Sequence, residues 1–121
     1  MYSFYNANPL GRHVNDCTIR AISLATGRSW DETYRKLSEF AQDLCVMPDD
    51  VFYIDAYLEE HFEKMYYCKR CNQITVGEFI ERNPHGTFLV TMSGHITCVK
   101  DGVIYDTFNP SDRFVWGVYK V

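Results

Sequence analysis

The sequence lacks any long hydrophobic run, and its first twenty residues carry Asn, Arg, His and Asp side chains. A membrane-spanning helix needs about 18 consecutive apolar residues, and a secretion signal needs an apolar run near its start. We therefore expect a cytoplasmic protein with neither a signal peptide nor a membrane partner. Positive charge is also scarce, with 12 Lys and Arg against 16 Asp and Glu. Nucleic acid is for this reason not an expected partner.

The chain also lacks an even set of cysteines, because it has five. An odd number without a secretion signal indicates reduced thiols rather than a disulfide framework. Cys68 and Cys71 form a single CxxC pair, and no second CxxC or HxxxH pair follows at zinc-finger spacing. We interpret them as ordinary strand or surface cysteines in preference to a zinc or redox site, and expect no metal and no cofactor.

Repeats, linkers and low-complexity segments are missing too. The chain is rich in apolar residues, since 46% of its 121 residues are hydrophobic and 16% are aromatic. That length and composition are enough for one hydrophobic core. We therefore expect a single domain over residues 1–121.

Helical spacing of apolar residues dominates the first part of the chain, and strand-like alternation dominates the second. Helices are predicted within residues 14–27, 27–44, 48–62 and 75–84. Short strands are predicted for residues 64–71, 86–93, 95–100, 102–108 and 113–121. Residues 1–13 are predicted to be an irregular lead-in. Helices followed by a mostly antiparallel sheet indicate the α+β class.

The first predicted helix carries a cysteine in its first turn. Asn15 and Asp16 favour a helix start, and Gly27 favours its end. Apolar residues on more than one face predict that this helix is buried nearly all round. Cys17 would lie where free backbone N–H groups and the helix dipole stabilise a thiolate. Arg20, four residues after Asp16, is predicted to form a surface ion pair with it.

A hairpin near the end of the sequence supplies a base for this cysteine. Asp101-Gly102 is a strong signal for a two-residue turn. If Lys100 and Val103 flank the turn, His95 and Asp106 become diagonal neighbours on one face of the hairpin. Diagonal pairs lie about 7 Å apart at the backbone, within reach of an imidazole and a carboxylate.

These residues form a candidate catalytic site. Cys17 would attack a carbonyl as a thiolate, His95 would act as base and then acid, and Asp106 would orient the imidazole. The backbone N–H of Cys17 would help to bind the oxyanion, and Asn15 is either a second donor or a helix cap. We assign no chemistry to the remaining histidines, which are His13, His61 and His85.

A buried helix that begins with Cys, followed by an antiparallel sheet carrying His and then Asp, resembles the papain-like cysteine peptidase superfamily. "NDC" and "GHITCVKDGVIYDTFNP" are most similar to small bacterial and phage papain-like proteins, and to peptidases that remove double-glycine leaders. "CTIRAIS" also resembles the cysteine helix of ovarian-tumour-type deubiquitinases. The resemblance implies a papain-like fold, with Cys17 as nucleophile, His95 as base and Asp106 as third member. Asn109 is the alternative third member, because papain itself uses an asparagine there.

Gly11 departs from the papain-like pattern, in which a glutamine about six residues before the cysteine completes the oxyanion hole. Asn15 or another lead-in residue must then take that role, or the site is degenerate. The expected function is a cysteine hydrolase that cleaves a peptide, isopeptide or related amide bond of a protein or peptide substrate. The alternatives are a degenerate binding module that sequesters a host factor, and a transglutaminase-like acyltransferase. The sequence does not indicate an oligomeric state.

Overall fold

The structure is a computed structural model that describes residues 1–48, 51–67 and 73–121, and within these ranges it confirms an α+β architecture. The helices are α1 (Cys17–Thr26), α2 (Trp30–Asp43), α3 (Val51–His61) and α4 (Val76–Arg82). The strands are β1 (Tyr2–Phe4), β2 (Glu63–Tyr67), β3 (Thr87–Met92), β4 (His95–Lys100), β5 (Val103–Asp106) and β6 (Gly117–Lys120).

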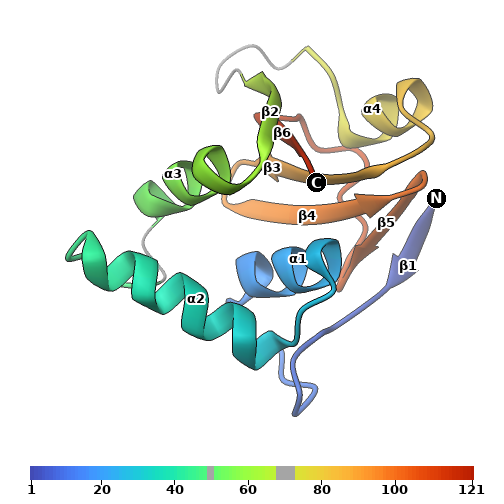
Figure 1. Cartoon of the computed structure of the whole chain (residues 1–121). Coiled ribbons are helices and arrows are strands. Elements are labelled where there is room, and N and C mark those ends of the chain that lie inside the picture. The colour runs from blue at the N-terminus through green and yellow to red at the C-terminus, as the bar shows by residue number, and fades with distance from the viewer. Residues whose placement is uncertain (49–50, 68–72) are drawn as a thin grey trace.

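The strands form one six-stranded sheet in the order β1-β5-β4-β3-β6-β2. Every described pairing in it is antiparallel except that of β1 with β5, which is parallel. Helices α1, α2 and α3 lie on one side of the sheet and α4 lies on the other (Figure 1). The strand β4, which begins with His95, therefore runs directly over the helix α1 that begins with Cys17.

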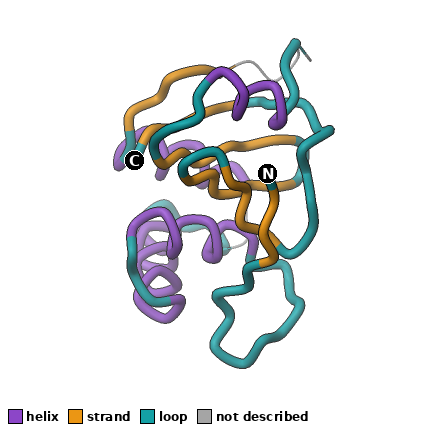
Figure 2. Tube along the Cα trace, turned by 90° about the vertical axis from the view of Figure 1, so that its right-hand side faces the viewer, coloured by secondary structure: helices purple, strands orange, loops and turns teal. Residues whose placement is uncertain are grey.

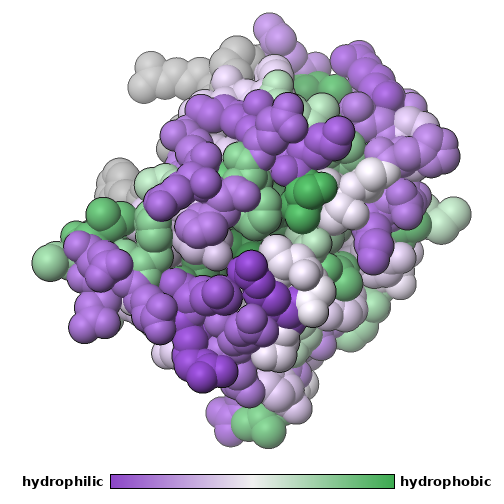
Figure 3. All heavy atoms as spheres, in the orientation of Figure 1, coloured by the Kyte–Doolittle hydropathy of each residue, from purple (hydrophilic) through white to green (hydrophobic). Residues whose placement is uncertain are grey.

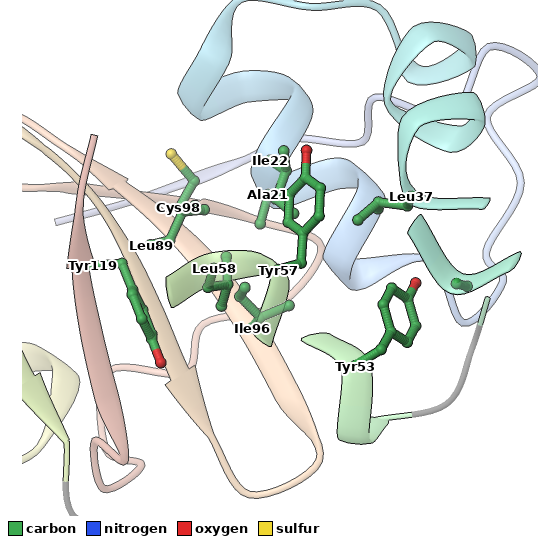
Figure 4. Close-up of a cluster of buried hydrophobic side chains, with 11 residues drawn as sticks. Ala21, Ile22, Leu37, Tyr53, Tyr57, Leu58, Leu89, Ile96, Cys98 and Tyr119 are labelled. Carbon is green, nitrogen blue, oxygen red and sulfur yellow. The ribbon is translucent and has the colours of Figure 1, made fainter. Parts of the chain in front are cut away.

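Two hydrophobic clusters hold the layers together, one on each face of the sheet. The first joins the three N-terminal helices to the sheet through residues such as Ile22, Leu37, Leu58 and Leu89, all at most 2% exposed (Figure 4). The second packs Val76, Phe79 and Ile80 of α4 against alternate residues of the same strands. Because successive strand residues point to opposite faces, one set of strands serves both clusters.

Local sequence signals explain several of the helix ends. The Ser29 side chain accepts a hydrogen bond from the Glu32 N–H at 3.1 Å and caps α2. Thr75 and Glu78 form the reciprocal capping box of α4. Gly27 ends α1 with φ 72°, a left-handed conformation that suits glycine. None of the ten residues of α1 is exposed, as its apolar pattern predicts.

Two predictions about the ends of the chain are wrong. Residues 1–13 are not wholly irregular, because Tyr2–Phe4 pair with β5. A three-residue strand is too short to show alternation, and its partner lies far away in sequence. The last strand covers only Gly117–Lys120 rather than residues 113–121, since Phe114 makes an isolated bridge to Thr75 instead of joining the sheet.

The helical spacing of Trp30, Tyr34, Leu37, Phe40 or Ala41, and Leu44 predicts one apolar face for α2, and the observed buried face differs from it. Leu37 and Ala41 are buried as predicted, with Thr33 one turn earlier, but Tyr34 is 45% exposed. Leu44 follows the helix and is exposed as well. Trp30 is only partly buried, so the first turns of α2 present aromatic surface rather than core.

The lead-in after β1 forms a long loop that projects from the sheet before the chain enters α1 (Figure 2). The face of the molecule in Figure 3 is mainly hydrophilic, with smaller groups of hydrophobic side chains between the polar ones. Within the described ranges, no helix is both long and apolar enough to cross a bilayer. The CxxC pair, Cys68 and Cys71, lies outside the described residues.

Candidate active site

Cys17 is the first residue of α1, so its side chain lies at the positive end of the helix dipole. Asp16 is the N-cap residue, but its side chain makes no capping hydrogen bond. The carboxylate is instead turned toward other partners, described below. The Asp16 side chain therefore does not cap the first N–H groups of α1, and these groups can donate hydrogen bonds to a negative charge at Cys17.

The β4–β5 hairpin has the predicted register, with Lys100 paired to Val103 across the turn. Asp101 and Gly102 both have positive φ, 49° and 78°, as a tight two-residue hairpin turn requires. His95 Nε2 lies 2.6 Å from Asp106 Oδ2, and both side chains are at most 7% exposed. The structure thus brings these two predicted site residues into a buried hydrogen bond.

Asp106 is fixed by contacts beyond His95. Its second carboxylate oxygen, Oδ1, accepts the Thr107 N–H at 2.7 Å. Its backbone carbonyl accepts the Tyr5 N–H at 2.8 Å and the Tyr2 hydroxyl at 3.1 Å. The N-terminal segment that contains β1 therefore holds the end of β5 in place.

Cys17 and His95 come from distant parts of the chain, yet they lie close enough for the thiol and the imidazole to shift each other's pKa. Since Nε2 of His95 is bonded to Asp106, the ring nitrogen left for the sulfur is Nδ1. The backbone N–H of Ile96 is also close enough to favour the Cys17 thiolate. The sulfur is therefore within reach of two donors, and the imidazole lies between the sulfur and a carboxylate.

These contacts shift three pKa values in complementary directions. Burial alone would raise the pKa of the Cys17 thiol, but the hydrogen bond and positive charge of His95 outweigh burial and lower it. Burial opposes the charged form of His95, but the hydrogen bonds to Asp106 and Cys17 raise its pKa to about 9. Burial also opposes the charged form of Asp106, yet the His95 hydrogen bond lowers its pKa. All three shifts favour the charged forms, which are the Cys17 thiolate, the His95 imidazolium and the Asp106 carboxylate.

A second group of polar side chains surrounds Asp16, which is 5% exposed. Its Oδ2 accepts the Trp30 indole N–H at 2.9 Å and the Asn8 side-chain amide at 3.3 Å. Its Oδ1 forms an ion pair with Arg20 Nε at 3.2 Å. The predicted Asp16–Arg20 pair is therefore present, but it is buried rather than on the surface.

Arg20 connects this group to the His95–Asp106 pair. Its Nη1 donates to the Thr107 hydroxyl at 3.0 Å, and Thr107 follows Asp106. Arg20 thus contacts both Asp16 and Thr107, and the Thr107 N–H donates to Asp106. Asp106 is bonded to His95, which lies beside Cys17. Because Cys17 follows Asp16 in the chain, these contacts form a closed ring. Nothing in the sequence indicates this closed ring of contacts except the spacing of Asp16 and Arg20.

A cleft of about 690 Å³ opens onto Cys17 and His95. Asn15 is exposed and lines the cleft, and it does not occupy the N-cap position. Gly11 is exposed and does not line the cleft. Of residues 1–15, only Val14 and Asn15 line it, so Asn15 is the polar side chain that this segment offers to the cleft.

The remaining candidates lie outside this arrangement. The Asn109 side chain is exposed and accepts the Ser111 N–H at 3.1 Å, while Asp106 occupies the position beside His95. The Phe108 ring packs beside the His95 imidazole, with 4.7 Å between the two ring centroids. His61 stacks on Tyr57. Among the described residues, no three His, Cys, Asp or Glu side chains form a group that could hold a metal.

The chain was compared with family models, with curated proteins and with solved structures, and none of the three comparisons found a match. The interpretation of the site therefore depends on the geometry of its own residues.

Proposed function

We propose that this protein is a papain-like cysteine hydrolase that cleaves a peptide, isopeptide or related amide bond. Cys17 is the nucleophile, His95 the general acid and base, and Asp106 the residue that orients the imidazole. The observation that supports this most is the position of His95, which is bonded to Asp106 through Nε2 and lies close enough to Cys17 for the two groups to shift each other's pKa. Buried ionisable groups with opposed pKa shifts beside a cleft are typical of catalytic sites.

The first half of the reaction forms a thioester. The Cys17 thiolate attacks the carbonyl carbon, an S–C bond forms, and the carbonyl electron pair moves onto oxygen as an oxyanion. The backbone N–H of Cys17 and the Asn15 side chain are the donors available to this oxyanion. When the intermediate collapses, the C–N bond breaks and the amine leaves with a proton from the His95 imidazolium.

The second half returns the enzyme to its starting state. Neutral His95 takes a proton from water, and the resulting hydroxide adds to the thioester carbonyl. Collapse of this second intermediate breaks the S–C bond, releases a carboxylic acid and restores the thiolate–imidazolium pair. Asp106 stabilises the imidazolium in both halves and stays ionised, as its lowered pKa requires.

Thiol reactivity gives the first test of this proposal. At pH 7 we expect iodoacetamide to alkylate Cys17 at least about 10-fold faster than Cys45, which is exposed, since thiolate character sets the rate. Cys98 should be the slowest of the three, because burial raises its pKa to about 12. Peptide mapping by mass spectrometry measures each rate. His95→Ala should remove the advantage of Cys17, and equal rates for Cys17 and Cys45 in the wild type would contradict the proposal.

Product analysis distinguishes a hydrolase from the two alternatives, an acyltransferase and a binding module. A peptide library incubated with the protein should yield new carboxyl termini, and Cys17→Ala should abolish them. Incorporation of an added primary amine in place of water would identify an acyltransferase. A reactive Cys17 that releases no product from the library, with no amine incorporated, would instead favour the binding module.

A further inference from the structure

A buried ion pair lies directly beside the proposed nucleophile. Asp16 precedes Cys17 in the chain, and Arg20 follows Cys17 by about one turn of α1. The side chains of Asp16 and Arg20 are only 4% and 11% exposed, and 3.2 Å separates Oδ1 of the first from Nε of the second. Two opposite charges are therefore held largely out of water next to the thiol.

Stability alone does not account for an ion pair in this place. Because both charges lose their water, a buried pair is often no more stabilising than apolar side chains of similar volume. This pair instead links separate segments to the start of α1. Asp16 Oδ2 accepts the Trp30 indole N–H of α2 and the side-chain amide of Asn8. Arg20 Nη1 donates to the Thr107 hydroxyl, just beyond β5, at 3.0 Å.

The contact between Arg20 and Thr107 reaches the third residue of the site. The Thr107 N–H donates to Asp106 Oδ1 at 2.7 Å, and Oδ2 of the same carboxylate lies 2.6 Å from His95 Nε2. One arginine side chain therefore joins the helix that carries the sulfur to the strand that carries the carboxylate. Because a displacement of α1 along β5 would break this contact, the contact restrains the position of Cys17 relative to the hairpin.

The two charges of the pair act on Cys17 in opposite directions. The positive charge of Arg20 lowers the pKa of the thiol, in addition to the larger effect of His95. A carboxylate beside the sulfur repels a thiolate, so Asp16 on its own disfavours the charged form. The neighbouring elements contribute titratable side chains of their own, except β3, which has none: His95 of β4, Asp106 of β5, Tyr34 of α2, and Tyr53 and Asp55 of α3.

We propose that Arg20 and Asp16 are a matched pair of positioning residues for the Cys17 nucleophile. Arg20 fixes the start of α1 against the end of β5, and Asp16 balances the positive charge that Arg20 brings beside the sulfur. This inference rests on the proposed function, because it takes Cys17 as the point of attack. It also differs from a purely structural role in one respect. Loss of Arg20 and loss of Asp16 should change the stability of the thiolate in opposite directions.

The pH dependence of Cys17 alkylation by iodoacetamide measures this difference, since it gives the midpoint pH at which the reactive thiolate forms. In Arg20→Gln the Asp16 carboxylate stays without its cation, so the midpoint should rise by about 1 pH unit. In Asp16→Asn the Arg20 cation stays without its anion, so the midpoint should fall by a similar amount. Lys64→Gln is the matched control and should leave the midpoint unchanged, because it opens an exposed ion pair with Glu59 that does not line the cleft.

The double variant Asp16→Asn/Arg20→Gln covers the case in which a single variant does not fold, because it leaves neither charge of the pair buried alone. Its midpoint should return close to the wild-type value and lie above that of Asp16→Asn, which isolates the effect of the Arg20 charge. Urea unfolding of every variant shows that the rates refer to folded protein.

Thr107→Val tests the restraint on α1 without changing a charge. Valine keeps the N–H that donates to Asp106 but removes the hydroxyl that Arg20 contacts. The probe is p-nitrophenyl acetate, from which the Cys17 thiolate takes the acetyl group: an S–C bond forms, the C–O bond breaks and p-nitrophenolate leaves. We expect this release to slow about 2- to 10-fold above the Cys17→Ala background, as loss of one hydrogen bond implies, with the alkylation midpoint unchanged.

The outcomes distinguish failure of this inference from failure of the proposed function. If Cys17 is alkylated faster than Cys45 but both single variants move its midpoint in the same direction, or not at all, only the positioning role is wrong. An unchanged p-nitrophenolate rate in Thr107→Val would also overturn that role. If Cys17 of the wild type reacts no faster than Cys45, both the proposed function and this inference fail.

Discussion

At the scale of single residues, the Cys17–His95–Asp106 arrangement depends on which groups accept and which donate. Asp106 has both carboxylate oxygens engaged, one by His95 and one by the Thr107 N–H. A carboxylate can only accept at these positions, so the His95 nitrogen facing it must carry a proton. The other nitrogen, which faces Cys17, is therefore the one that exchanges a proton with the sulfur.

Asp106→Asn should slow the alkylation of Cys17 by iodoacetamide about 10- to 1000-fold. The amide has the shape of the carboxylate, but it supplies no negative charge to hold the imidazolium and offers His95 a donor as readily as an acceptor. Stopped reactions analysed by mass spectrometry give the rate. Asn109→Ala is the control and should change the rate little, since its side chain lies outside the site. The reverse pattern would assign the third role to Asn109.

The sequence could predict these three residues because each has a local signal. His95 and Asp106 are only 11 residues apart, and the Asp-Gly turn between them sets their register. Asn15, Asp16 and the apolar residues that follow them predict the start of α1. The surroundings of Asp16 have no such signal, because its partners Asn8, Trp30 and Arg20 come from separate parts of the chain. Only the folded structure shows that they meet.

At the scale of elements, the strand β1 is not predicted by the sequence, yet it supports the backbone of the candidate site. It pairs parallel to β5 and places Phe4 opposite Asp106. The Tyr5 N–H, just after it, donates to the Asp106 carbonyl at 2.8 Å. A short edge strand thus restrains the backbone that carries the third residue of the site.

Tyr5→Pro should therefore weaken both the fold and the site. Proline has no N–H, so the Asp106 carbonyl loses a donor, which costs about 1–3 kcal/mol in free energy of unfolding where water cannot replace it. Tyr5→Ala is the matched control, since it removes the ring and its edge contact with Tyr105 but keeps the N–H. Urea unfolding and the alkylation rate of Cys17 are measured on both. Equal losses in the two variants would show that the ring, not the backbone bond, matters.

At the scale of the whole molecule, the two hydrophobic clusters have different structural roles. The cluster under α1, α2 and α3 sets the position of Cys17, whereas the cluster under α4 supports the opposite face of the sheet. The apolar periodicity of the helices predicts that they bury one face each, but not that the buried residues form two clusters on opposite faces of the sheet. It does not predict how far α2 is rotated, and that rotation brings Tyr34 to the cleft.

The stability of the whole protein should vary with pH through the His95–Asp106 pair. The pKa of His95 is raised above its ordinary value of 6.5, so its contribution is complete below pH 6.5 and is lost as the pH rises through its folded value. The pKa of Asp106 is lowered from 3.8, so its contribution is complete above that value and is lost as the pH falls through the folded one. The pair should stabilise the fold most between about pH 4 and 6.5.

This dependence is best measured without the thiol, whose own titration would interfere. Free energies of unfolding of Cys17→Ser and of Cys17→Ser/Asp106→Asn, compared across pH 3–10, should differ by about 1–3 kcal/mol on the plateau. The difference should shrink in both acid and alkali. A difference that is constant with pH would mean that the pair is not ionised in the folded protein.

The distribution of the site along the chain also has a kinetic consequence. His95 and Asp106 close a short loop, so their contact forms at a small entropic cost once the hairpin turns. Cys17 can join them only after α1 has docked on a sheet built mainly from the end of the sequence. During synthesis the cysteine therefore leaves the ribosome long before its activating partners do. Under the proposed function, the nascent chain carries an ordinary thiol, and Cys17 becomes a strong nucleophile only in the last stage of folding.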